Sequence, residues 1–181
     1  KNRQDTLTGN KPNDLFFKEL FRVSKNQVIW GGNYFALPIS RGWIAWVKNK
    51  SDNYFSDAEL AWTSYDRILK VFDYMWSGML QQNMKNKQEK IHPTEKPIDL
   101  YKYICDNYTK PTDTILDCFG GSMSNAIACH MKRRKLTIIE LDSEYFASAL
   151  LRFSEYEQKV EDIKEFGYAK TKINAQNPVL F

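Results

Sequence analysis

The stretch TILDCFGGSMSNAIA, Thr114 to Ala128, places a short apolar run, an acid, two glycines and a series of small residues in direct succession. This order predicts a strand over Thr114–Asp117, a glycine turn and a helix over Ser124–Met131. A second strand over Leu136–Glu140 and a helix from Ser143 to about Gln158 are predicted to follow. Such a β-α-β-α series indicates a parallel sheet covered by helices.

Each of these two strands ends in an acid, and the acids favour a particular kind of ligand. Glu140 lies nineteen positions after Gly121, the distance at which an acid typically accepts hydrogen bonds from ribose hydroxyls. The dinucleotide pattern Gly-x-Gly-x-x-Gly fails here, and Asp117 would repel a pyrophosphate. Asp117 would suit a cationic amine or a sulfonium, which favours S-adenosylmethionine. The alternative is a tight turn that needs glycine for packing only.

The first half of the chain carries a different pattern. A helix is predicted over NDLFFKELFRVS, with Asn13 or Asp14 as its cap. Short strands are predicted in QVIWGG, Trp43–Val47, Ala58–Ser64 and ILKVFDYMW, and their spacing predicts antiparallel neighbours. A polar loop over Gln81–Lys96 leads to a helix that begins near Pro97.

Several stretches together resemble one known family. They are VSKNQVIWGGNYF (Val23–Phe35), FSDAELAWTS (Phe55–Ser64), IHPTEKPIDLY (Ile91–Tyr101) and ILDCFGGSMSNAIA followed by IIELDSEYF. In this order they resemble the amino-methylating DNA methyltransferases whose catalytic half precedes the cofactor half, and the resemblance covers nearly the whole chain.

The resemblance implies an α/β fold of the Rossmann-like, S-adenosylmethionine-dependent type, with a mixed, mainly parallel sheet flanked by helices. It implies one methyltransferase domain over 1–181, with the end of the catalytic half at 1–47, a small target-recognition region at 48–95 and the cofactor half with a tail at 96–181. The implied reaction transfers a methyl group from S-adenosylmethionine to the exocyclic amine of a flipped-out base, adenine by the resemblance of WGGNYF.

Site residues follow from the same resemblance. Asp117 would bind the methionyl amino group and Glu140 the ribose hydroxyls, and Asn33 would border the base pocket. The cofactor would also be lined by Phe119, Gly120, Gly121, Ser122, Ser124, Lys96 and Pro97. The loop residues Lys85, Lys87, Lys90 and His92 would contact double-stranded DNA, unless this is an ordinary solvated loop. For His92, a hydrogen bond to the cofactor and a structural role in its turn are the alternatives.

Two departures from the family pattern stand out. Met123 replaces the last glycine of Phe-x-Gly-x-Gly, and the catalytic Asp/Asn-Pro-Pro-aromatic motif is absent from the sequence. The polar start indicates that the motif belongs to a preceding segment. The alternatives are a catalytically inactive cofactor- or DNA-binding subunit, or an amine methyltransferase acting on cytosine or RNA.

The remaining features yield weaker predictions. The net charge of +4 is compatible with a polyanionic partner. Three cysteines and two histidines without zinc spacing indicate reduced intracellular thiols and no metal. The resemblance implies a cytoplasmic protein of a bacterium or phage. KRRK, Lys132–Lys135, is interpreted as a solvated turn. A sliding-clamp contact through Gln176, Leu180 and Phe181 competes with an ordinary tail, and a homodimer is compatible with the resemblance.

Overall fold

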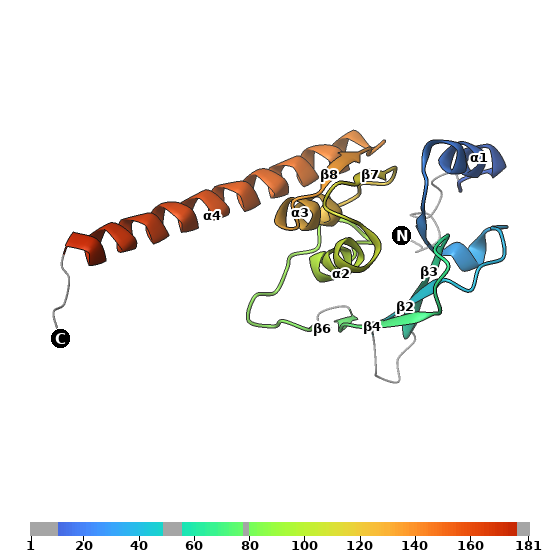
Figure 1. The fold of residues 1–181 in the computed structure, drawn as a ribbon, viewed down its shortest axis with the longest axis horizontal. Coiled ribbons are helices and arrows are strands. Elements are labelled where there is room, and N and C mark those ends of the chain that lie inside the picture. The colour runs from blue at the N-terminus through green and yellow to red at the C-terminus, as the bar shows by residue number, and fades with distance from the viewer. Residues whose placement is uncertain (1–10, 49–55, 78–79, 177–181) are drawn as a thin grey trace. The chain divides into compact units, whose positions relative to one another are not determined.

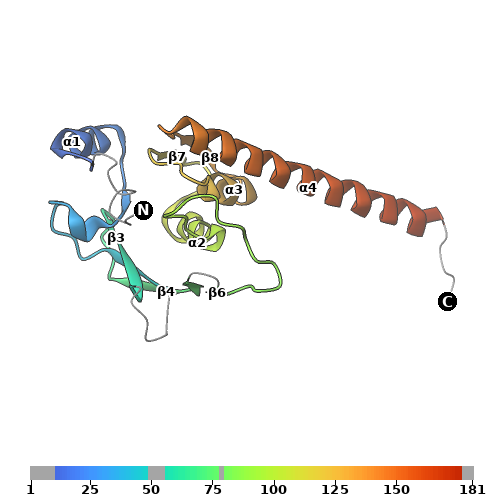
Figure 2. The same ribbon diagram turned by 180° about the vertical axis from the view of Figure 1, so that it is seen from behind.

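The structure is a computed structural model that describes residues 11–48, 56–77 and 80–176, with side chains of the last helix described to residue 165. The chain divides into two compact units, residues 1–85 and 86–181. Figures 1 and 2 show the elements of both units from opposite sides. The predicted single methyltransferase domain, with its inner bounds, stays a prediction.

The first unit begins with helix α1, Asp14–Val23. The Asn13 side chain accepts a hydrogen bond from the Phe16 backbone N–H at 3.0 Å, so Asn13 is the cap that the sequence predicts. Strand β1 (Val28–Trp30) and the short 3-10 helix η1 (Gly32–Tyr34) follow. Gly31 ends the strand in a left-handed conformation, with φ of 69°.

A four-stranded sheet forms the rest of this unit. Its strand order is β1-β3-β2-β4, with β2 at Trp43–Val47, β3 at Ala58–Thr63 and β4 at Lys70–Asp73. Strand β3 is antiparallel to both β1 and β2, as predicted, whereas β2 and β4 are parallel. The stretch predicted as one strand from ILKVFDYMW is divided between β4 and β5 (Trp76–Ser77), and β5 pairs with β6 (Leu80–Gln81).

Tryptophans fill the core of the first unit. Trp46 and Trp62 are 1% and 3% exposed, and their indole N–H groups donate to the Tyr74 and Pro38 carbonyls. A Cβ on Gly32 would lie 2.4 Å from the Trp62 Cβ, so the sheet needs glycine there. These tryptophans stabilise the core, and their polar atoms have protein partners.

The second unit contains the predicted parallel pair. Helix α2 spans Ile98–Tyr108, β7 Thr114–Asp117, α3 Ser124–Met131, β8 Lys135–Ile138 and α4 Ser143–Gln176. Strands β7 and β8 are parallel, with Asp117 opposite Ile138. The bounds predicted for β7 and α3 are confirmed, and the α/β fold class with mixed sheets is confirmed.

The prediction for α4 was too short by 18 residues, since the helix continues from Gln158 to Gln176 (Figure 1). Its later turns carry sparser apolar residues, Val160, Ile163, Phe166 and Ile173, which still keep helical spacing. They also carry polar pairs at helical spacing, such as Gln158 with Asp162 at 2.8 Å and Lys164 with Glu161 at 2.6 Å. The prediction ended where the apolar residues become sparse and did not use these weaker signals.

Helix α3 packs between α2 and α4, and the core of the second unit lies around it. Leu100, Ile127, Ala128 and Ala149 are each at most 3% exposed. In the described part of the chain, no helix combines the length and the apolar character needed to span a membrane.

The KRRK segment after α3 is only partly the solvated turn that the sequence predicts. Arg133 is exposed, but Arg134 is half-buried. The Arg134 guanidinium donates to the Cys105 carbonyl at 3.3 Å and to the Thr109 hydroxyl at 2.9 Å, so it satisfies the end of α2.

Candidate functional site

Asp117 ends strand β7, and both of its carboxylate oxygens have donors. Oδ1 accepts from the Phe119 backbone N–H at 3.0 Å, and Oδ2 accepts from Asn125 Nδ2 at 2.9 Å. Burial raises the pKa of Asp117 above its ordinary value, while these two hydrogen bonds oppose that shift. The carboxylate is therefore oriented, and a cationic ligand would offset the cost of its burial.

Glu140 follows β8 at the same edge of the parallel pair. Glu140 Oε2 accepts from the Gly121 backbone N–H at 2.7 Å, and Oε1 accepts from the Asp142 backbone N–H at 2.9 Å. Two backbone donors thus fix the carboxylate. Each carboxylate oxygen has a further lone pair, so the group can still accept hydrogen bonds from a diol.

The glycine turn between β7 and α3 brings its backbone close to β8. The Gly120 N–H donates to the Ile139 carbonyl at 2.7 Å, and a Cβ on Gly120 would lie 3.0 Å from Ile138 Cγ1. Gly121 adopts a φ of 50°, which side chains rarely adopt. The turn consequently exposes backbone, free of side chains, beside the two acids.

His92 lies against this turn. A Cβ on Gly121 would meet His92 Nδ1 at 3.5 Å, and the imidazole packs edge-on against Tyr145 with ring centroids 4.4 Å apart. Burial lowers the pKa of His92, and the nearby Glu140 opposes that shift. His92 was predicted to hydrogen-bond the cofactor or DNA, or to be a structural histidine of its turn. The structure places it beside the glycine turn, and both contacts stay predictions.

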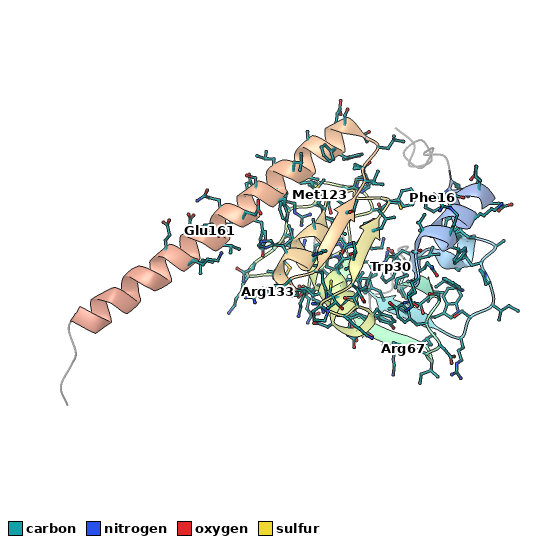
Figure 3. All side chains as sticks on the ribbon, turned by 45° about the horizontal axis from the view of Figure 1, so that its top comes forward. Phe16, Trp30, Arg67, Met123, Arg133 and Glu161 are labelled. Atoms are coloured by element: carbon teal, nitrogen blue, oxygen red, sulfur yellow. The ribbon has the colours of Figure 1, made fainter. Side chains whose placement is uncertain are left out.

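Met123, the residue in place of the third glycine, is buried and left-handed. Its φ is 54°, its side chain is 3% exposed, and it precedes helix α3 directly (Figure 3). The neighbouring hydroxyls of Ser122 and Ser124 lie 3.0 Å apart. Both serines are buried, and their predicted role as cofactor-lining residues stays a prediction.

Arg152 is a contact of this turn that the sequence reasoning missed. Its Nη1 donates to the Ser122 carbonyl at 2.9 Å and to the Ser124 hydroxyl at 3.1 Å. Its Nη2 lies 3.1 Å from Glu95 Oε1, and the Glu95 side chain is completely buried. Glu95 lies in the quoted segment IHPTEKPIDLY, and an acid there was a signal for a buried cationic partner.

Other predicted cofactor residues surround the same edge in different environments. The Phe119 side chain is 63% exposed next to Asp117. Lys96 is half-buried, and its charge acts on both Asp117 and His92. Pro97 is fully buried and caps helix α2.

The remaining predicted residues lie in other parts of the chain, and their roles stay predictions. Asn33 is exposed on η1 of the first unit, and Lys85 is exposed at the end of that unit. Lys87 and Lys90 are exposed in the loop that opens the second unit. Leu180 and Phe181 lie outside the described residues, as does the side chain of Gln176.

A pair of buried cysteines, Cys105 and Cys129, contacts the residue that donates to Asp117. Cys129 Sγ donates to Asn125 Oδ1 at 3.4 Å and lies 3.9 Å from Cys105 Sγ. Asn125 is the residue that donates to Asp117. The orientation of the Asn125 amide is thus fixed at its oxygen as well as at its nitrogen.

A family model described as DNA methylase, of the N6- and N4-methylating type, matches residues 5–151. The type II methyltransferase M.PvuII of Proteus hauseri is 29% identical over 99 residues, which cover 53% of this chain and 30% of that protein. The DNA adenine methyltransferase YhdJ of Escherichia coli K12 is 39% identical over 61 residues, which cover 34% of this chain and 21% of that protein. The chain thus spans less than a third of the length of these relatives.

Solved structures give similar matches. The complex of M1.HpyAVI with S-adenosylmethionine has 31% identity and a TM-score of 0.43, with 61% of this chain and 60% of the other covered. The cytosine-N4-specific PvuII DNA methyltransferase has 21% identity and a TM-score of 0.47, with 62% of this chain and 50% of the other covered.

Proposed function

We propose a function from one premise: the chain belongs to the DNA methylase family that methylates exocyclic amines of bases. The proposed role of the second unit is to bind S-adenosylmethionine at the edge where Asp117 and Glu140 follow the two parallel strands. The observation that supports it is the joint placement of two oriented carboxylates beside a glycine turn.

The residues present fit this cofactor. Its methionyl ammonium would pair with Asp117, whose buried carboxylate has a raised pKa and gains most from a cation. The ribose hydroxyls would donate to the remaining lone pairs of Glu140. The backbone of Gly120 and Gly121 would let the ligand approach closely, and the half-buried Lys96 would suit the methionyl carboxylate.

The proposed reaction is an in-line displacement. When bound, the cofactor would supply an electrophilic methyl group on its sulfonium. Transfer of that methyl group to the base nitrogen would leave the neutral thioether S-adenosylhomocysteine, and the amine would lose one proton. The residues of this chain bind and orient the reactants, which is where such sites derive most of their rate enhancement.

The base-binding half of the reaction needs a further segment. Residues 1–181 contain no Pro-Pro pair, so the Asp/Asn-Pro-Pro-aromatic motif of the family is not among them. We propose that methyl transfer requires that motif from elsewhere in the full protein. The competing function is a cofactor-binding subunit without chemistry.

Adenine is the proposed target base. The resemblance of WGGNYF and the identity to the adenine methyltransferase YhdJ support adenine. The similarity to the cytosine-N4-specific PvuII enzyme supports cytosine. An assay of the full protein with labelled S-adenosylmethionine distinguishes the two bases. It compares methyl transfer to duplexes whose target strand contains only adenine amines with transfer to duplexes whose target strand contains only cytosine amines.

Isothermal titration of the chain with S-adenosylmethionine and S-adenosylhomocysteine tests the cofactor site. Asp117→Ala and Glu140→Ala are each expected to weaken binding by a factor of about 100, because each removes a charged or paired hydrogen-bond acceptor. Asp106→Ala is the matched control, since Asp106 pairs with Lys132 on the outside of α2. If both variants bind S-adenosylmethionine with wild-type affinity, the proposal is contradicted.

The exposed lysines of the loop are the proposed DNA contacts. Lys87→Gln and Lys90→Gln, in the full protein, are each expected to reduce the slope of log K against log salt by about 1. Lys164→Gln is the control, because that exposed lysine pairs with Glu161 on α4. An unchanged slope in both loop variants would exclude these phosphate contacts.

A further inference from the structure

Met123 occupies a backbone conformation that its side chain disfavours. Its φ of 54° is one that glycine adopts readily and other residues adopt rarely. No side-chain hydrogen bond caps helix α3 at this position. Locally, the Met123 N–H donates to the Gly120 carbonyl at 2.9 Å, and the Met123 carbonyl accepts from the Ile127 N–H at 3.2 Å. Contacts from outside the turn add to these bonds in holding a methionine in this conformation.

The Arg152 guanidinium contacts the residues on both sides of Met123. Nη1 donates to the Ser122 carbonyl at 2.9 Å and to the Ser124 hydroxyl at 3.1 Å. The Ser122 and Ser124 hydroxyls lie 3.0 Å from each other. The guanidinium and the two serines therefore form one connected hydrogen-bond network. The peptide segment containing Met123 is thereby held at both ends.

Glu95 in turn fixes the guanidinium. Arg152 Nη2 lies 3.1 Å from Glu95 Oε1, with the Glu95 side chain 0% and the Arg152 side chain 15% exposed. Glu95 Oε2 accepts from the Ile91 backbone N–H at 3.0 Å, and Gln88 Oε1 accepts from Arg152 Nη2 at 3.3 Å. The pair is buried, and each of its side chains has a further hydrogen bond, to the Ile91 backbone and to Gln88, which together define its geometry.

We propose that Arg152, oriented by Glu95, is a positioning residue that holds Met123 left-handed and so keeps the cofactor turn in its binding geometry. In this role the ion pair replaces the conformational freedom that a glycine would supply at position 123. The inference rests on the proposed function in naming S-adenosylmethionine as the ligand of the turn. The Gly121 N–H, which donates to Glu140, belongs to the same turn and depends on its shape.

A double-mutant cycle on the full chain tests the coupling. Arg152→Ala is made in the wild type and in a Met123→Gly background, and the dissociation constant of S-adenosylmethionine is measured for all four proteins. In the wild type, Arg152→Ala is expected to weaken binding about tenfold, because a charged donor to the turn is lost. In the Met123→Gly background the loss is expected to fall below about threefold, because glycine keeps the left-handed backbone unaided.

A second measurement does not depend on the cofactor. Amide hydrogen exchange of residues 120–125 without ligand is expected to accelerate about tenfold in Arg152→Ala, and less in Arg152→Ala with Met123→Gly. If the wild type does not bind S-adenosylmethionine, the proposed function fails while this exchange result still decides the positioning role. Equal losses of affinity in both backgrounds, or unchanged exchange of the turn, would overturn the inference.

Arg134→Ala is the matched control. Arg134 also donates three hydrogen bonds, to Thr109, Lys132 and Cys105, none of them on the turn. It is expected to lower the melting temperature without weakening cofactor binding in either background. If Arg152→Ala does not fold, Arg152→Lys keeps the charge opposite Glu95 without the bridging guanidinium, and a smaller loss with the same dependence on position 123 is expected.

Discussion

The turns before and after helix α3 each contain a left-handed residue that is not glycine. Before it, Met123 has φ of 54°, and after it Arg133 has φ of 53°. Figure 3 labels both residues, at opposite ends of the helix. The Met123 side chain is 3% exposed, whereas Arg133 is exposed. The same backbone conformation thus occurs once in a buried site and once on the surface.

The two turns differ in what satisfies their backbone. After the helix, the Arg133 N–H donates to the His130 carbonyl at 3.1 Å and the Arg134 N–H to the Cys129 carbonyl at 2.8 Å, and the Arg134 guanidinium donates to the Lys132 carbonyl at 2.7 Å. Before the helix, an acid takes part, since Gly121 donates to Glu140. The turn that ends α3 is thus joined to a cation that follows it directly in the chain, whereas the turn before α3 is joined to charged side chains from distant segments, Glu140 and Arg152.

Replacing Met123 should give the largest effect and separate the two turns most clearly. Met123→Ala is expected to lower the free energy of unfolding by about 3 kcal/mol, because a buried side chain is lost. Arg133→Ala is expected to change it by less than about 0.5 kcal/mol. Urea denaturation of both variants measures the difference.

Met123→Gly adds a check on the backbone. Glycine is expected to be about 0.5–1 kcal/mol more stable than alanine at position 123, since left-handed strain outweighs the entropy that glycine loses. Alanine is usually the more stable of the two in regular structure. An alanine variant that is more stable than the glycine variant would show that no strain exists at this position.

Gly120→Ala should give the next largest effect. The added Cβ would lie 3.0 Å from Ile138 Cγ1 and 3.2 Å from the Ile139 carbonyl oxygen, so β8 must shift. The expected loss in the free energy of unfolding is about 2 kcal/mol. Thermal unfolding and cofactor titration of the same variant are expected to change together, because this contact positions the strand that leads to Glu140. A variant as stable as the wild type would contradict the tight approach.

Local sequence patterns predicted part of this site well. The bounds of β7 and α3, the cap at Asn13 and the placement of Asp117 and Glu140 at one sheet edge all follow from short-range periodicity and spacing. These features depend on neighbouring residues only. The antiparallel pairing of β3 with β1 and β2 also followed from the absence of long helices between the strands.

Features set by contacts between distant segments could not be read in the same way. The Arg152 side chain reaches Ser122 from 30 positions away, and His92 meets the Gly121 turn from another loop. The propensity of methionine gave no sign of a left-handed conformation at position 123, because that conformation is typical of glycine or asparagine. The one signal was that Met123 stands where the family pattern has a glycine. The later turns of α4 were assigned to no helix, because their apolar residues, Val160, Ile163, Phe166 and Ile173, are sparse although they keep helical spacing.

Asn125 links α3 to the acid of the first turn, and its loss should change the pH dependence. Burial raises the folded-state pKa of Asp117, and the hydrogen bond from Asn125 opposes that shift. Asn125→Leu is therefore expected to raise the pKa further. The acidic limb of S-adenosylmethionine affinity should move upward by about one pH unit, equivalent to about 1.4 kcal/mol. Titration between pH 4 and pH 8 measures it.

The sign for stability follows from proton linkage. Because the folded-state pKa of Asp117 exceeds its unfolded value, the folded protein binds more protons in the interval between them. The contribution of Asp117 is most favourable below the unfolded pKa and is lost as the pH rises through the folded one. Asn125→Leu should enlarge this loss of stability and extend it to higher pH. Asn107→Leu, which removes an exposed amide on α2, should leave it unchanged.

Arg133→Gly should give the smallest effect, and its sign is opposite to the others. Glycine relieves the left-handed strain, which should stabilise the folded state by about 1–2 kcal/mol. The greater entropy of the unfolded glycine chain should offset about 0.5–1 kcal/mol of this. The free energy of unfolding is therefore expected to rise by about 0.5 kcal/mol. The urea midpoint should rise while cofactor affinity stays unchanged, since the turn after α3 contacts neither acid through the bonds described above. A loss of affinity in Arg133→Gly would mean that the two ends of α3 are coupled through the helix. The turn after α3 would then belong to the site, and the contrast between a binding turn and a helix-ending turn would no longer hold.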